Sequence, residues 1–87
     1  MDQPKALAAL CALANATRLE LVRLLIVTGP RGLAASDIAG RLGVSASRLS
    51  FHLAALEQAG LVTSRRASRN IFYAADTRAL GGVIGYL

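Results

Sequence analysis

The sequence predicts a mainly α-helical single domain, residues 1–87, that carries one small β-hairpin. Apolar residues recur at helical spacing over most of the chain, as in Leu49, Leu53 and Leu56. Between Leu61 and Ala74, two short runs of β-branched and aromatic residues flank a polar loop instead. The expected order is therefore helix, helix, short helix, helix, strand, strand, helix.

The first two helices are predicted from composition and from their boundaries. Ala6–Ala14 is rich in Ala and Leu, which are strong helix formers. Asn15 then offers a cap, and Ala16–Thr28 has the spacing of a second helix. The turn residues of 29–32, Gly-Pro-Arg-Gly, end it.

The next two helices are expected to be joined by a tight turn. A short helix covers Ala35–Leu42, and Gly43 supplies a left-handed C-terminal cap. Ser45 is a strong N-cap for a helix over Ala46–Ala59, which Gly60 ends. This spacing is typical of a helix-turn-helix.

A hairpin and one further helix complete the chain. The expected strands are Leu61–Arg65 and Asn70–Ala74, with the loop Arg66–Arg69 between them. Asp76 or Thr77 then caps a last helix that runs to Leu87. A hairpin that follows a helix-turn-helix is a wing, so the predicted fold is a winged helix-turn-helix.

The composition limits the class of protein. Charged residues make up 17% and hydrophobic residues 54% of the chain, which argues against disorder. No apolar run approaches the ~18 residues of a membrane span, and Met1–Lys5 does not resemble a signal peptide. One Cys excludes an intramolecular disulfide and fits a reducing cytoplasm. The expected protein is small, cytoplasmic and independent of membranes, and its net charge of +5 allows a polyanionic partner.

The helix that begins at Ser45 is the expected recognition helix, whose first residues reach base edges in the major groove. Arg48 is the best candidate base reader, because a guanidinium bonds O6 and N7 of guanine together. The serines and the positive end of the helix dipole suit phosphates. The alternative is that Arg48 is an ordinary solvated surface residue without a role in DNA binding. With the leucines facing the core, the residues expected largely on the other faces are Ser47, Arg48, Ser50, Phe51 and His52. His52 either touches DNA or packs beside the hairpin.

The hairpin is the second candidate site. Arg65, Arg66 and Arg69 lie in or beside its loop, and no acidic residue occurs between Gln58 and Ala75. A basic loop fits the phosphate backbone or the minor groove, and the alternative is an ordinary solvated hairpin.

Cys11 is expected to be a small buried hydrophobe in the first helix, and its alternative role is a thiol ligand for a soft metalloid. The last helix contains Gly81, Gly82 and Gly85, and small residues permit close helix approach. We therefore expect the first and last helices to pair across the two-fold axis of a homodimer. The absence of a polar cap at Leu87 suggests that the natural chain continues.

The residues also resemble a known family. Leu13–Leu21 is similar to the opening helix pair of the ArsR/SmtB winged-helix repressors, and Ser45–Leu53 with Leu56–Val62 resembles their recognition helix and the start of their wing. Arg65, Arg66, Arg69 and Tyr73 match the basic wing and its returning strand. The resemblance covers about residues 7–80 and implies homodimers that bind operator DNA, repress transcription and are released by an inducer. It implies DNA contacts by two groups of residues and adds Asn70. These groups are Ser45, Ser47, Arg48, Ser50 and His52 of the recognition helix, and Arg65, Arg66 and Arg69 of the wing.

The sensor sites of that family are incomplete in this chain. Where one common site has paired cysteines, this sequence has Ala34–Asp37, and where another has Asp, His and Glu on the last helix, it has Asp76 without a His. The remaining motifs look most like the arsenite-responsive branch, which implies As(III) as the inducer, bound through cysteines that would lie beyond Leu87. Trivalent arsenic takes about three thiolates, so Cys11 alone supplies no complete metal site.

Three alternatives stay open at the level of sequence. The first is a repressor without a metal site that responds to redox state or another signal. The second is a winged-helix protein-interaction module, which the clustered arginines disfavour. The third, an enzyme, is the least supported, because Ser50 and His52 are two apart on a helix and do not form a nucleophile–base pair.

Overall fold

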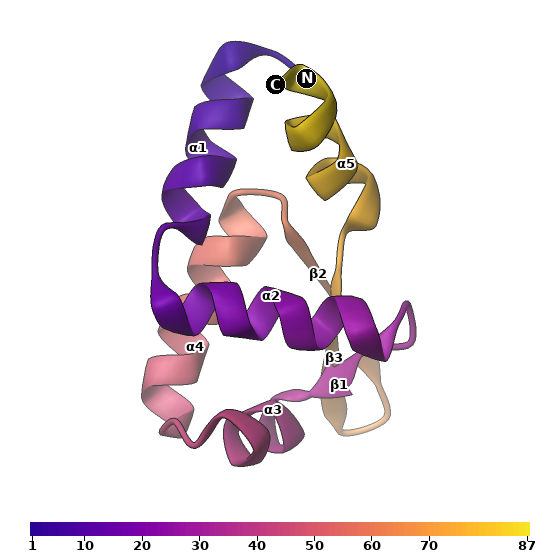
Figure 1. Cartoon of the computed structure of the whole chain (residues 1–87). Helices are drawn as coiled ribbons and strands as arrows, with labels where there is room; N and C mark the ends of the chain where they lie inside the picture. Colours follow the sequence, from indigo (N-terminus) through magenta and orange to yellow (C-terminus); the bar gives the residue numbers. More distant parts are fainter.

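The computed structural model describes all residues from 1 to 87 and contains five helices and a three-stranded antiparallel sheet (Figure 1). This confirms the predicted fold class. The elements are α1 (Gln3–Leu13), α2 (Ala16–Thr28), β1 (Leu33–Ala34), α3 (Ala35–Leu42), α4 (Ala46–Gln58), β2 (Val62–Ala67), β3 (Asn70–Ala75) and α5 (Thr77–Tyr86).

Side-chain caps set most of the helix starts. Asn15, Ser45 and Asp76 each accept a hydrogen bond from the backbone N–H three residues later, at 3.0–3.2 Å. Gly43 ends α3 in the left-handed conformation with φ 68°. The predicted caps at these four positions are therefore confirmed.

The first helix begins earlier than Ala6. Its N-cap is Asp2, whose carboxylate accepts a hydrogen bond of 2.9 Å from the Lys5 N–H. Pro4 lies in the first turn, where its missing N–H is not needed. The buried face of α1 consists only of alanines, which lets it approach its neighbours closely: Ala6, Ala9 and Ala12.

The sheet contains a strand that the sequence analysis missed. β1 is two residues long and pairs with β3, with Leu33 opposite Tyr73 and Ala34 opposite Phe72. The chain enters β1 through Gly32, which has φ 74° and lies so close to β3 that a Cβ atom would overlap the carbonyl of Tyr73. β1 escaped prediction because two residues carry no periodicity, and only the pairing with β3 defines it.

The hairpin is longer and its turn is tighter than expected. β2 extends to Ala67 and pairs there with Asn70, so the turn consists of Ser68 and Arg69 alone. Ser68 has φ 59°, a conformation that tight hairpin turns require. Arg66 therefore lies in a strand and not in a loop, which corrects the predicted loop Arg66–Arg69.

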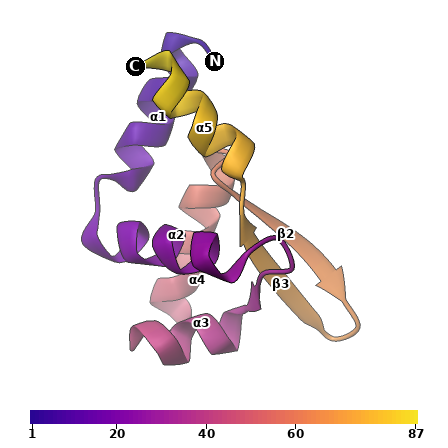
Figure 2. The same cartoon turned by 45° about the vertical axis from the view of Figure 1, so that its right-hand side comes forward.

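The core joins all five helices to the sheet, and it includes the predicted leucine stripe of α4. Figures 1 and 2 show α1 and α5 side by side at one end, with the start of α4, α3 and the hairpin turn toward the other end. No helix is both long and apolar enough to cross a bilayer. The largest fully buried side chains are Leu21, Leu25, Ile38, Leu49, Leu56, Leu61 and Val62.

Candidate nucleic-acid interface

The two sides of α4 differ sharply in burial. Its leucines, at positions 49, 53 and 56, are buried in the core as predicted. The opposite side presents Ser47, Arg48 and Phe51 to solvent. These three residues and His52 line an open hollow of about 360 Å³ near the helix N-terminus. The face that a helix-turn-helix turns toward DNA is thus basic and polar, with one aromatic ring.

The serines of the recognition helix are exposed. The Ser45 hydroxyl accepts a hydrogen bond of 3.2 Å from the Arg48 N–H and lies 3.4 Å from the Ser47 hydroxyl. Ser50 is exposed farther along the helix. The first turn of α4 therefore combines free backbone N–H groups with hydroxyls, which is a suitable environment for a phosphate.

His52 is placed differently from expectation. It is only 8% exposed, although the sequence analysis placed it on the outward faces of the helix. The spacing contained the signal, because His52 lies three residues after Leu49 and four before Leu56, on the buried stripe. Its Nδ1 atom accepts a hydrogen bond of 3.0 Å from Arg18 Nε.

The surroundings of His52 favour the neutral imidazole. Burial lowers the pKa of His52 below its ordinary value of 6.5, and the positive charges of Arg18 and Arg48 lower it further. A neutral ring that accepts at Nδ1 carries its proton on Nε2. The hydrogen bond from Arg18 requires this form, since a protonated ring has no acceptor.

Arg18 and Phe51 were not among the predicted site residues. The Arg18 guanidinium carbon lies 5.6 Å from the centroid of the Phe51 ring, and the rings of Phe51 and His52 meet edge to face at 5.8 Å. Arg18 belongs to the first turn of α2, far from α4 in sequence. The outward position of Phe51 could be inferred from its spacing, whereas the contact of Arg18 required the tertiary structure.

The arginines of the hairpin have unequal surroundings. Arg65 lies over the ring of Phe72, 4.9 Å from its centroid, and its Nη2 donates a hydrogen bond of 2.8 Å to the carbonyl of Arg31. Arg66 is the next residue along β2, so its side chain projects from the other face of the hairpin. Arg69 is exposed in the turn.

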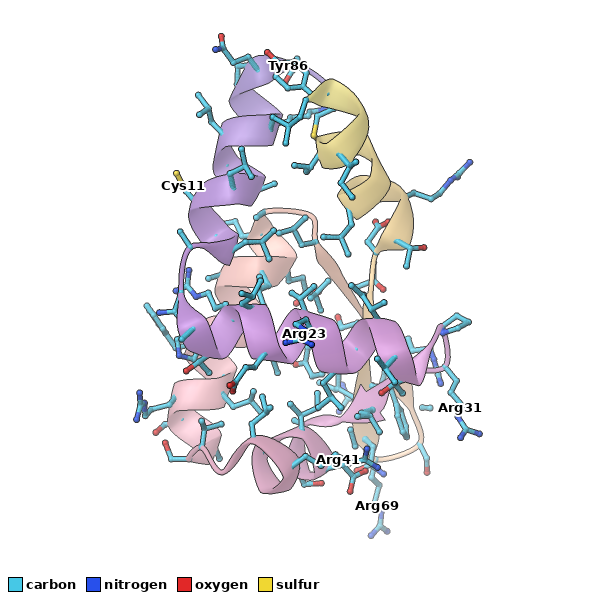
Figure 3. The ribbon with its side chains drawn as sticks, viewed as in Figure 1. Cys11, Arg23, Arg31, Arg41, Arg69 and Tyr86 are labelled. Carbon is cyan, nitrogen blue, oxygen red and sulfur yellow. The ribbon has the colours of Figure 1, made fainter.

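Further arginines from other elements lie near this end of the molecule. Figure 3 shows Arg31, Arg41 and Arg69 toward the end formed by α3 and the hairpin. Asn70, the first residue of β3, is exposed beside Arg69. Arg31 follows a Gly-Pro turn, for which the sequence predicted only the end of a helix.

Cys11 is exposed on the outer side of α1, so the expectation of a buried cysteine is wrong (Figure 3). The alanines occupy the inward face of α1, and position 11 falls outside that face. A single copy of the chain brings together no group of three or more His, Cys, Asp or Glu side chains that could hold a metal ion.

The end opposite the hairpin turn is apolar. Helices α1 and α5 contact one another and leave large apolar side chains in solvent. Such a surface is typical of a protein interface. Its members are Leu7, Leu10, Ile84, Tyr86 and Leu87.

Comparison with known proteins agrees with this geometry. A helix-turn-helix domain family matches residues 13–65. The chain is 34% identical over 86 residues to the transcriptional activator HlyU of Vibrio cholerae, and the match covers 99% of this chain and 77% of HlyU. A solved ArsR-like transcriptional regulator from Rhodococcus is 33% identical with a TM-score of 0.85, over 97% of this chain and 76% of that one. This chain belongs to the ArsR family of winged helix-turn-helix regulators.

Another structural relative of this ArsR-family chain bears on assembly. The homodimeric winged helix-turn-helix DNA-binding domain from Mycobacterium bovis, a possible ArsR-family regulator, is 27% identical with a TM-score of 0.81. The similarity covers 95% of this chain and 75% of that one. HlyU, YgaV of Escherichia coli and the Rhodococcus protein are each named as transcriptional regulators, which agrees with the prediction of a regulator in place of an enzyme. The finer assignment to the arsenite-responsive branch stays a prediction.

Proposed function

We propose that two copies of the chain form a symmetric dimer that binds near-palindromic operator DNA and represses transcription. The observation that carries this proposal is the separation of two surfaces at opposite ends of the domain. The exposed face of α4 and the hairpin arginines gather at one end, and the apolar surface of α1 and α5 lies at the other. Pairing through α1 and α5 leaves both recognition helices free, about one or two helical turns of DNA apart.

The proposed contacts divide into base reading and backbone positioning. Arg48 reads a base in the major groove, and Ser45, Ser47 and Ser50 bind phosphates around the start of α4. Arg66, Arg69 and Asn70 follow the DNA backbone from the wing. Arg65 contributes its charge from the wing while its side chain braces the hairpin.

His52 has a different part in this proposal. Its burial and its hydrogen bond to Arg18 support a positioning role beneath the interface, in place of the direct DNA contact expected from the sequence. The hydrogen bond from Arg18 to His52 holds the Arg18 side chain beside the exposed face of α4.

The sign of regulation is a separate part of the proposal. The resemblance to ArsR/SmtB repressors supports repression, whereas HlyU is named an activator. Transcription in vitro from a promoter that contains the bound site tests this part directly. Fewer transcripts with added protein are expected, and more transcripts would reverse the sign without affecting DNA binding.

The inducer hypothesis is that trivalent arsenic releases the protein from DNA through thiolates. The 87 residues contribute Cys11 alone, and arsenic takes about three thiolates, so any complete site needs thiolates from elsewhere. The alternative inducer is an oxidant. The Cys11 thiol is exposed, so an oxidant can reach it, whereas a buried thiol would be inert.

Fluorescence anisotropy with the protein's own promoter DNA tests the proposed function. Tight binding that weakens steeply with salt is expected, because released counterions accompany phosphate contacts. Affinity that does not depend on salt or on sequence would contradict it. Adding arsenite or a mild oxidant to the complex, with Cys11→Ser as the matched variant, then separates the two inducer hypotheses.

A further inference from the structure

Phe51 is an aromatic side chain on the polar face of the recognition helix. The residue is 67% exposed and lies three residues after Arg48 and four after Ser47, which places all three on one face of α4. Burial in the core does not explain a large apolar ring at this position. The ring lines the same hollow as Ser47 and Arg48.

The ring is held in place by two neighbours although it is exposed. The Arg18 guanidinium carbon lies 5.6 Å from the ring centroid, and the edge-to-face contact with His52 spans 5.8 Å at 66° between the ring planes. Arg18 is itself fixed by its bond to His52, and His52 is anchored in the core. A side chain restrained before binding loses less conformational entropy when a ligand covers it.

The major groove offers this ring one apolar partner. Among the base edges there, only thymine carries a methyl group, at C5, and phenylalanine is one of the side chains that contact it. The guanidinium of Arg48 is suited to guanine on the same face. Three residues of helix rise about 4.5 Å, and base pairs are spaced about 3.4 Å apart, so the two contacts fall within about two base pairs.

We propose that Phe51 is a specificity-determining residue that selects thymine through its 5-methyl group, and that Arg18 and His52 are its positioning residues. The inference rests on the proposed function, because it requires α4 to lie in the major groove. To the proposed function it adds a preference for thymine, together with defined roles for Phe51, Arg18 and His52.

Replacing single thymines with deoxyuridine tests the proposal, because this change removes only the methyl group. The probe is a duplex enriched by the wild-type protein from a random-sequence library, with each thymine of a half-site replaced in turn. At one thymine position the wild-type affinity should fall about fourfold per half-site, the effect of withdrawing one buried methyl group. Replacing that thymine in both half-sites should lower the affinity about 15-fold.

Variants of Phe51 assign the effect to the ring. Phe51→Ala should bind the thymine and deoxyuridine duplexes equally, and Phe51→Leu should retain part of the difference. Arg48→Ala is the matched control, because it should bind less tightly yet keep the full methyl effect. Thermal unfolding of Phe51→Ala should match that of the wild type, since the residue is exposed.

Variants of His52 test the positioning role. His52→Asn keeps an acceptor near the position of Nδ1 and should preserve the methyl effect, whereas His52→Leu should reduce it without changing the dependence of affinity on salt. A purely structural role would alter affinity for both duplexes equally.

The outcomes separate this inference from the proposed function. Tight, salt-dependent binding with no thymine position sensitive to deoxyuridine would overturn the role of Phe51 and leave the proposed function intact. The same sensitivity in wild type and Phe51→Ala would also overturn it. Failure of the wild type to enrich any duplex would overturn both.

Discussion

Arg18 Nε donates a hydrogen bond of 3.0 Å to Nδ1 of His52, and this bond joins the first turn of α2 to the middle of the recognition helix α4 across 34 positions of sequence. The bond exists only while the imidazole is neutral. It therefore couples a titratable group in the core to the placement of an arginine beside the proposed DNA-binding face of α4.

The first prediction is that folding stability depends on the protonation of His52. Burial and two neighbouring arginines lower its pKa in the folded state, so the unfolded chain binds a proton more readily. The free energy of unfolding should fall as the pH drops through 6.5, and this loss should level off below the lowered pKa of the folded state. Urea unfolding between neutral and acidic pH measures this change.

The control for this prediction is His52→Asn, which does not titrate in this range. Its free energy of unfolding should change less with pH over the same interval. An equal change in both proteins would assign the pH dependence to carboxyl groups and not to His52.

The second prediction concerns two glycines with positive φ. Gly43→Ala meets no atom within 4 Å, so its penalty is the strain of the left-handed backbone at φ 68°, about 1–2 kcal/mol. Gly32→Ala is also strained, at φ 74°, and it forces a Cβ atom against the Tyr73 carbonyl, for about 1–3 kcal/mol more. Chemical denaturation of the two variants should show this difference, and equal losses would mean that β3 yields freely at that point.

The third prediction concerns base reading by Arg48. The guanidinium is exposed at the start of α4 with no hydrogen bond to another side chain. Arg48→Ala should reduce discrimination at one base position by about 1–3 kcal/mol. Competition binding with operators mutated one base pair at a time measures it. A uniform loss of affinity for all sequences would show that Arg48 contacts phosphate only.

The fourth prediction distinguishes two neighbouring arginines of the wing. Arg66→Ala should reduce the slope of log affinity against log salt by about one, because one phosphate contact is lost. Its free energy of unfolding should change little. Arg65→Ala should instead lower the free energy of unfolding by about 1 kcal/mol, since it removes the contact with Phe72 and the hydrogen bond to Arg31.

Salt titrations of DNA binding and denaturation curves on both proteins check this pair of effects. If Arg65→Ala reduced the slope of log affinity against log salt by about one and left the free energy of unfolding unchanged, the hydrogen bond to Arg31 would have to open when DNA binds.

The fifth prediction is that α1 and α5 form the dimer surface. Leu7 of α1 is 54% exposed among other apolar side chains, so Leu7→Glu should place a charge in the interface and shift the protein toward monomers. Val27→Glu is the matched control, because Val27 is 86% exposed on α2, outside the proposed interface. Sedimentation at several protein concentrations distinguishes the two, and equal dissociation would place the interface elsewhere.

The parts of this fold that were predictable are those with local causes. Ser45 caps α4 because a hydroxyl satisfies a free N–H, and Gly43 ends α3 because only glycine adopts that conformation without strain. Both signals lie within a few residues of what they determine. The leucine stripe of α4 was predictable for the same reason.

The parts that were not predictable depend on distant partners. β1 exists through its pairing with β3, and the position of Arg18 depends on a residue in another helix. Cys11 was expected inside because a free cysteine in an Ala/Leu-rich helix is commonly a small buried hydrophobe, whereas α1 buries alanines and leaves Leu7 and Leu10 in solvent. Sequence periodicity does not show which face of an apolar helix meets its own domain and which is left for another chain.

The two-residue strand β1 has a consequence for how the domain opens. Its pairing with Tyr73 and Phe72 ties the segment between α2 and α3 to the middle of β3. The amides of β1 and of the paired part of β3 should therefore exchange with solvent as one cooperative unit, while those at the Ser68 turn exchange sooner. The helix-turn-helix and the part of the wing that pairs with β1 would then open together, and only the tip of the wing would be free to adapt to DNA.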